Sequence, residues 1–244
     1  MGLSHLFYPW GFILQILALV HFFRRRPDGY WFYVILFFGA LGSVIYFLVE
    51  VVPDFGLLRE PFTRAARRQR LKELEAIVEE NSAVGNLEEL ADLSFDEGQW
   101  ARARELYDKL LKVSRPVSVD PYYRRGLSAL ALGDAVQAVP DLEKVVADEP
   151  KYDFYRATGM LASAYARAGL ADKADAQFRS ATGISTLSET YFNYATFLVD
   201  QQRPAEAREW AQRILDKTRT LPRFAKRQER PWVQKARALL KKLG

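Results

Sequence analysis

The side chains best suited to catalysis or metal binding are scarce in this sequence. It has no Cys and only two His, His5 and His21, both within one apolar N-terminal stretch. The lack of Cys excludes a disulfide framework, a Cys-ligated zinc or iron–sulfur site and a Cys nucleophile. Because both His lie in that stretch, a His-based triad or a His-ligated metal site in the rest of the chain is excluded as well.

Carboxylates are plentiful, but their pattern does not indicate acid–base chemistry. Adjacent pairs occur at Glu79–Glu80, Glu88–Glu89 and Asp148–Glu149, each among polar neighbours in segments with helical periodicity. Nothing near them predicts the raised pKa that a catalytic acid needs. The chain also lacks the nucleotide-binding, zinc-protease and Ser-hydrolase motifs. We therefore expect no enzyme activity, cofactor, metal or small-molecule substrate.

Two apolar stretches dominate the N-terminus of this 244-residue chain, at residues 6–23 and 30–52. About 20 apolar residues in a helix span the hydrocarbon core of a bilayer. The intervening RRRPDG turns the chain back, and the sequence before the first stretch lacks the basic region of a cleaved signal peptide. Residues 1–52 are therefore predicted to form a transmembrane helical hairpin that contacts the lipid bilayer.

The distribution of basic residues sets the expected orientation. Arg24, Arg25 and Arg26 occupy the loop, whereas a larger basic cluster follows the second stretch. This excess favours a multi-pass protein of the inner (cytoplasmic) membrane with its C-terminal part in the cytoplasm, although the loop arginines favour the opposite orientation. The cluster either contacts the membrane surface or only directs insertion. The candidate surface residues are Arg64, Arg67, Arg68 and Arg70.

The hairpin resembles the N-terminal two-helix segment of the phospholipase D and cardiolipin synthase family. Arg25-Arg26-Pro27 matches the basic loop of that segment, and Gly42 and Tyr46 match its second helix, although Gly39 stands where Pro is usual. Neither His is followed two residues later by Lys, so the catalytic His-x-Lys motif of that family is absent. The resemblance implies an anchor and no activity.

An internal repeat runs through the rest of the chain. Ala103, Ala138, Ala174 and Ala207 are separated by 35, 36 and 33 residues. A small residue lies twelve positions before each Ala, a turn Gly lies five before the first three, and a large apolar residue lies four after those three. Small residues let two antiparallel helices approach closely, and Gly permits the positive φ of a tight turn. The pattern predicts four helical pairs over residues 86–218.

This pattern resembles the tetratricopeptide repeat, a helix–turn–helix of about 34 residues. The sequence departs from it at four positions. Arg125 stands where a large apolar residue is usual, Pro140 should kink or delay its helix, Gln202 replaces the turn Gly, and Pro204 opens a helix. The predicted fold class is all-α, an N-terminal transmembrane helical hairpin followed by a tetratricopeptide-like α-solenoid.

Two flanking segments complete the expected organisation. Residues 53–85 form a basic juxtamembrane linker with a helix at 63–80, and residues 219–244 form a basic capping segment whose helix starts at Pro231. A stacked array requires such caps. Residues 219–244 contain nine basic residues and one acidic residue. These residues form a solvated helix face, contact anionic lipid or an acidic partner, or bind nucleic acid. Nucleic-acid binding is the least favoured of the three, because two aromatic residues are too few to form a stacking platform.

The resemblance implies that a protein or peptide partner binds in the concave groove lined by the first helix of each repeat. The Lys and Asn pairs with which some relatives clamp a terminal carboxylate are missing here. Tyr123 and Phe192 could equally be packing between repeats. The candidate partner-binding residues are Glu88, Asp92, Phe95, Asp96, Tyr123, Leu127, Arg156, Arg167, Phe192, Asn193 and Thr196.

The sequence therefore predicts a membrane-anchored scaffold or adaptor that binds a protein partner, with no nucleic acid expected. The alternative is an accessory protein of phospholipid metabolism, in which the hairpin and the basic ends contact anionic lipids.

Overall fold

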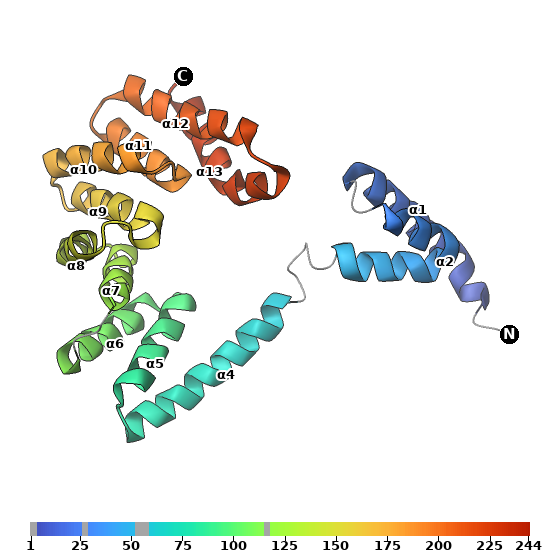
Figure 1. Ribbon diagram of the computed structural model, residues 1–244, viewed down its shortest axis with the longest axis horizontal. Helices are drawn as coiled ribbons and strands as arrows, with labels where there is room; N and C mark the ends of the chain where they lie inside the picture. The colour runs from blue at the N-terminus through green and yellow to red at the C-terminus, as the bar shows by residue number, and fades with distance from the viewer. Residues whose placement is uncertain (1–3, 26–28, 52–58, 115–117) are drawn as a thin grey trace. The chain divides into compact units, whose positions relative to one another are not determined.

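The computed structural model describes residues 4–25, 29–51, 59–114 and 118–244. Every element in these ranges is a helix (Figure 1). The chain divides into two compact units, Met1–Lys72 and Glu73–Gly244. The all-α prediction is therefore confirmed for the described residues.

The N-terminal unit contains two apolar helices that pack against each other. They are α1 (Ser4–Arg25) and α2 (Tyr30–Tyr46), followed by a five-residue π-helix, Phe47–Val51. Small residues allow their close approach, since a Cβ on Gly11 would lie 2.9 Å from the Cβ of Ala40. The Gln15 amide donates to the Ile35 carbonyl at 3.0 Å, and His21 Nδ1 lies 2.8 Å from the Tyr46 hydroxyl.

The second apolar stretch is not one straight helix, which corrects the sequence-based expectation. Gly39 interrupts α2 with φ 53° and ψ −126°, values that L-residues rarely adopt. A Cβ on Gly42 would lie 2.1 Å from the Val34 carbonyl oxygen, so the second half of α2 folds back onto the first. By length and composition alone, one helix, Tyr30–Val49, is sufficient to cross a membrane, and the apolar segment Trp10–Arg24 is shorter.

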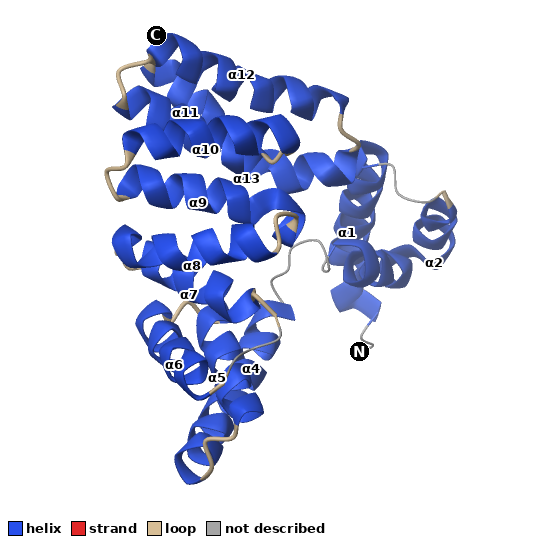
Figure 2. Cartoon of the chain, turned by 60° about the vertical axis from the view of Figure 1, so that its left-hand side comes forward, coloured by secondary structure: helices blue, strands red, loops and turns tan. Residues whose placement is uncertain are grey.

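The C-terminal unit is a stack of helical pairs (Figure 2). The helix α4 (Arg59–Glu80) leads into it and is longer than the predicted 63–80. The pairs are α5 (Val84–Asp96) with α6 (Trp100–Val113), α7 (Asp120–Ala131) with α8 (Ala135–Asp148), α9 (Arg156–Arg167) with α10 (Ala171–Ile184), and α11 (Ser188–Asp200) with α12 (Pro204–Thr220). A short 3₁₀ turn, Tyr152–Tyr155, precedes α9, and α13 (Arg223–Lys242) packs on α12.

The repeat register places the predicted residues in the core. Ala103, Ala138, Ala174 and Ala207 are all fully buried, and Ala91, Ala162 and Ala195, twelve positions before three of them, are fully buried too. The aromatic or aliphatic side chains that follow by four residues, Tyr107, Leu142 and Phe178, are at most 1% exposed. Small side chains at the helix crossings therefore leave room for the large ones to fill the space between layers.

The tight turn within each pair has the same geometry in all four copies. Gly98, Gly133 and Gly169 have φ of 73°, 83° and 78°, and Gln202 takes the same left-handed conformation in the fourth copy with φ 58°. In each turn the next residue donates its N–H to a carbonyl five positions back, as Gln99 does to Ser94 at 2.9 Å. This hydrogen bond closes the end of the first helix and directs the second helix back alongside it.

Pro140 and Pro231 lie inside helices that begin earlier in the structure than the sequence predicts. The helix α8 begins at Ala135 and continues through Pro140, and α13 begins at Arg223 and continues through Pro231. Pro removes one backbone donor, which leaves the carbonyl four residues earlier without its helical partner. Around Pro140 the loss is tolerated because Val136 is 68% exposed and water can bond its carbonyl.

Candidate functional site

The first helices of the four pairs form one continuous face of the C-terminal unit. Neighbouring first helices contact each other directly, α5 with α7, α7 with α9, and α9 with α11. We call the surface they share the first-helix face. Side chains at positions i, i+3, i+4 and i+7 of a helix point to the same side. On α7 these positions are Asp120, Tyr123, Arg124 and Leu127.

A cavity of about 690 Å³ opens on the first-helix face between α5, α7 and α9. We call it the central cavity. Its walls combine four aromatic rings, three aspartates, two arginines and one leucine. The lining residues are Phe95, Asp96, Trp100, Asp120, Tyr123, Arg124, Leu127, Tyr152, Asp153 and Arg156.

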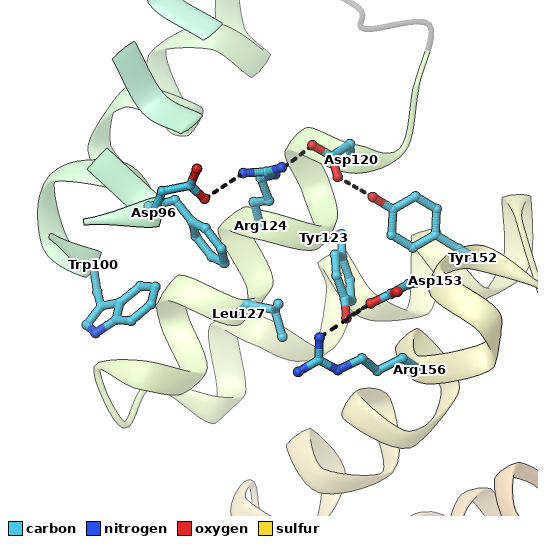
Figure 3. A pocket seen from close by; sticks show the side chains of 10 residues that line it. Asp96, Trp100, Asp120, Tyr123, Arg124, Leu127, Tyr152, Asp153 and Arg156 are labelled. Atoms are coloured by element: carbon cyan, nitrogen blue, oxygen red, sulfur yellow. Dashed lines mark hydrogen bonds and ion pairs between the residues drawn. The ribbon is translucent and has the colours of Figure 1, made fainter. Parts of the chain in front are cut away.

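Arg124 organises the charges at the upper rim of this cavity, where Figure 3 shows it between Asp96 and Asp120. Its Nε lies 2.7 Å from an Asp120 carboxylate oxygen, and its Nη1 lies 3.5 Å from Asp96. The other Asp120 oxygen accepts a hydrogen bond from the Tyr152 hydroxyl. Burial opposes the charge of Arg124, but the charges of Asp120 and Asp92 raise its pKa. The guanidinium therefore stays charged and rigidly placed.

The aromatic rings of the cavity pack edge to face. Phe95 and Trp100 lie 5.1 Å apart, and Tyr123 and Tyr152 lie 4.9 Å apart, both measured between ring centroids. The Arg124 guanidinium lies 5.3 Å from the centre of the Phe95 ring. Such contacts hold the rings in place and leave flat apolar surface toward the opening.

A strained turn forms the wall next to α9. Asp153, Phe154 and Tyr155 have φ of 47°, 53° and 65°, and three consecutive left-handed residues other than Gly are unfavourable. Asp153 holds this turn by accepting a hydrogen bond from the Tyr123 hydroxyl at 3.2 Å and an ion pair from Arg156 at 3.6 Å. Phe154 is 86% exposed beside the cavity.

The titration behaviour of the tyrosines suits binding by neutral hydroxyl groups. Burial raises the pKa of Tyr107 and Tyr152. The hydrogen bonds that their hydroxyls donate to neighbouring carboxylates raise the pKa further. Burial likewise raises the pKa of Tyr123, and nearby Arg156 opposes that shift. Burial also raises the pKa of Asp92, although its hydrogen bond from Tyr107 at 2.6 Å lowers it. These hydroxyls therefore act as fixed donors to carboxylates.

A second cavity, of about 300 Å³, opens farther along the first-helix face. We call it the C-terminal cavity. It lies between α9, α11 and α13, and Lys235 of α13 contributes to its wall. The lining residues are Ser163, Ala166, Arg167, Phe178, Phe192, Asn193, Thr196, Phe197, Asp200 and Lys235.

The predicted partner-binding residues fall into these two cavities with two exceptions. The central cavity contains Phe95, Asp96, Tyr123, Leu127 and Arg156, and the C-terminal cavity contains Arg167, Phe192, Asn193 and Thr196. Glu88 and Asp92 line neither, and the Asp92 carboxylate instead accepts a hydrogen bond from the Tyr107 hydroxyl. That these residues bind a partner stays a prediction.

Eleven of the twenty lining residues were not among the predicted partner-binding residues. They are Trp100, Asp120, Arg124, Tyr152 and Asp153 in the central cavity, and Ser163, Ala166, Phe178, Phe197, Asp200 and Lys235 in the C-terminal cavity. Asp120 and Arg124 share the helical spacing of Tyr123 and Leu127, so that spacing could have identified them. Trp100, Tyr152, Asp153 and Lys235 lie on other elements, and no local signal connects them to the face.

The basic residues after the apolar stretch lie on α4. Arg67, Arg68 and Arg70 are exposed, and the Arg64 side chain lies outside the described residues. Arg26 and Pro27 of the apolar hairpin's loop also lie outside them. Within the described part of the chain, no group of three or more His, Asp or Glu is arranged to hold a metal ion.

Comparison with known proteins agrees with this architecture. A tetratricopeptide-repeat family model matches residues 88–138 and 123–186. Residues 41 to the end of MamA from Desulfovibrio magneticus RS-1 are 22% identical with a TM-score of 0.58, over 68% of this chain and 93% of that one. No curated protein sequence matches the chain.

A second solved structure is YrrB, described as a tetratricopeptide-repeat protein with an unusual peptide-binding site. It is 16% identical with a TM-score of 0.55, over 68% of this chain and 86% of that one. At these identities the likeness shows the fold, which is a tetratricopeptide-like α-solenoid.

Proposed function

We propose, from the tetratricopeptide-repeat solenoid in this chain, that the protein is a membrane-anchored scaffold whose first-helix face binds an extended segment of a protein partner. The observation that carries this proposal is the pair of cavities on one face, whose lining includes nine of the eleven residues that the resemblance to the tetratricopeptide repeat selected. An extended segment lying across α7, α9 and α11 would place side chains in both.

The chemistry of the central cavity supports a peptide ligand. Its fixed aromatic rings offer apolar contact, while each of its two guanidiniums already pairs with a carboxylate of the cavity wall. A ligand side chain can therefore bury apolar surface there without leaving a charge unpaired. The likeness to YrrB, which is described as peptide-binding, favours the same use of the face.

Site-specific photocrosslinking tests the proposal. We expect p-benzoylphenylalanine at Leu127 or Thr196, both on the first-helix face, to give a discrete adduct of higher mass in cells that produce the protein. The matched control is Val136, which is 68% exposed on α8, a second helix, and lines neither cavity. Adducts at Val136 as strong as those at Leu127, or none at either first-helix position, would refute the proposal.

The exposed side chains of the N-terminal unit support membrane anchoring. Phe37 and Phe38 are 77% and 63% exposed, and Phe12 and Leu41 are 65% and 64% exposed. Polar groups point inward instead, where Gln15 and His21 make hydrogen bonds between the helices. An outer surface that is apolar matches the requirements of a lipid environment, while one buried donor of this unit, Trp31 Nε1, has no hydrogen-bond partner among the described residues.

We expect the full chain to stay in the membrane pellet after alkaline carbonate extraction, and a variant that lacks residues 1–52 to move to the supernatant. Full-length protein in the supernatant would contradict anchoring. A C-terminal reporter that is active only in the cytoplasm, fused to the full chain, tests the orientation that the basic cluster predicts.

A further inference from the structure

The charged groups near the central cavity already have partners on the protein. Arg124 bonds Asp120 and Asp96, and Arg156 forms a two-pronged contact with Glu189 at 2.5 and 3.2 Å. A ligand carboxylate that approached these arginines would compete with carboxylates already in place. The central cavity is therefore poorly suited to an acidic group.

The C-terminal cavity is different, because its cations have no carboxylate partner among the described residues. Arg167 donates only to a backbone carbonyl, that of Leu130, at 3.3 Å. The Lys235 ammonium lies 4.2 Å from the Trp232 ring centre and 5.7 Å from that of Phe192, with no acid within 4.0 Å. The side-chain amide of Asn193 makes no hydrogen bond to a described residue.

The fold brings these donors together from three helices. Arg167 ends α9, Asn193 lies in α11, and Lys235 lies in α13, which packs on α12 and α11 much as the first helix of a further repeat would. The rings of Phe192 and Trp232, tilted by 46° with their centroids 6.0 Å apart, hold Lys235 at the rim. The cavity thus offers two cations and an amide donor from a fixed frame.

We infer that the C-terminal cavity binds side-chain carboxylates of an acidic segment in the protein partner. This inference rests on the proposed function and adds the chemistry of the ligand. An incoming Asp or Glu would gain charge-assisted hydrogen bonds without displacing any existing partner. Asp200 lines the same cavity and leaves it with a net charge of +1, so it weakens the attraction without cancelling it.

Selection of random peptides displayed on phage, using the detergent-solubilised full chain, tests the inference. Displayed peptides have no free C-terminus, so a terminal carboxylate cannot account for binding. We expect the selected peptides to be enriched in Asp and Glu, and the enrichment to disappear on a Lys235→Glu and Arg167→Glu double variant. Selected peptides without acidic enrichment would overturn this inference alone, whereas no selection of any peptide would overturn the proposed function as well.

Affinity measurements on one selected peptide locate the effect. We expect Lys235→Gln to weaken binding about tenfold by fluorescence anisotropy and Asp200→Asn to strengthen it severalfold, with both differences shrinking as salt rises. The matched control is Lys241→Gln, which removes an exposed cation from the same helix outside the cavity and should leave the affinity within twofold. Equal losses for Lys235→Gln and Lys241→Gln would show only a general charge effect and would overturn the inference.

Discussion

Replacing Asp141 with alanine is expected to lower the free energy of unfolding by about 2–4 kcal/mol, because it removes the buried carboxylate that pairs with the half-buried Arg125. Asp141 is 5% exposed and accepts two hydrogen bonds from Arg125, at 2.7 Å from Nε and 2.6 Å from Nη2. Arg125 also contacts Asp108 at 2.9 Å. Without Asp141, the Arg125 guanidinium would keep its contact with Asp108 but lose the two hydrogen bonds to its buried carboxylate partner. Urea unfolding followed by far-ultraviolet circular dichroism measures the change.

A double variant separates the unpaired charge from the lost contact. Arg125→Leu with Asp141→Ala should lose about 1–2 kcal/mol less than Asp141→Ala alone, because no half-buried guanidinium is left without its closest carboxylate. Repeats of this type usually have a large apolar residue at the position of Arg125, which makes leucine a suitable replacement there. A double variant less stable than Asp141→Ala would contradict this account.

The control for this prediction lies in the same helix. Asp148 pairs with Lys144 at 2.8 Å, and both side chains are nearly half exposed. We expect Asp148→Ala to change the free energy of unfolding by less than about 0.5 kcal/mol, because solvent screens exposed ion pairs. Equal effects at Asp148 and Asp141 would mean that burial does not decide the outcome.

Gly159→Ala should destabilise the solenoid by about 1–3 kcal/mol, because α9 and α11 approach too closely for a methyl group. A Cβ on Gly159 would lie 2.5 Å from Thr190 Oγ1 and 3.1 Å from Thr190 Cγ2. Thr190 is 2% exposed, so its side chain has no open space to move into. Adding Thr190→Ala should recover part of the loss, because that change removes both clashing atoms.

Thermal unfolding of the single and double variants checks this contact. The control is Gly183→Ala in α10, where an added Cβ meets no atom within 4 Å. That change should leave stability unchanged or raise it slightly, because Ala favours the helix more than Gly does. A single variant Gly159→Ala as stable as the unchanged protein would show that the two helices can separate without cost.

Much of the solenoid could be predicted from residue spacing. The recurring Ala residues and the turn glycines follow from local demands, since a helix crossing needs a small residue and a positive φ favours Gly. The positions of Pro140 and Pro231 misled the prediction of helix starts, because Pro is unfavourable inside a helix by itself, and only the folded structure shows that α8 and α13 continue through it. The sequence shows a Gly at position 39, which can adopt a positive φ, but the reversal of α2 at that residue depends on how the two halves of the helix pack.

The candidate site could be predicted only for residues on the first helices. The resemblance to the tetratricopeptide repeat selected Tyr123, Leu127 and Phe192, which do line the cavities. Tyr152 and Asp153 reach the central cavity through a left-handed turn that no sequence pattern predicts. Lys235 reaches the C-terminal cavity only because α13 continues the stack.

By itself, the sequence determined the helical class, the repeat register and the absence of cysteine chemistry, because each depends on residue type and short-range spacing. Tertiary structure alone decided which charges on different helices pair. Arg125 finds Asp141 sixteen residues away and Arg156 finds Glu189 thirty-three residues away, whereas Arg167 and Lys235 find no acid among the described residues. Such pairings depend on how successive helices stack in space, and spacing along the chain does not encode that geometry.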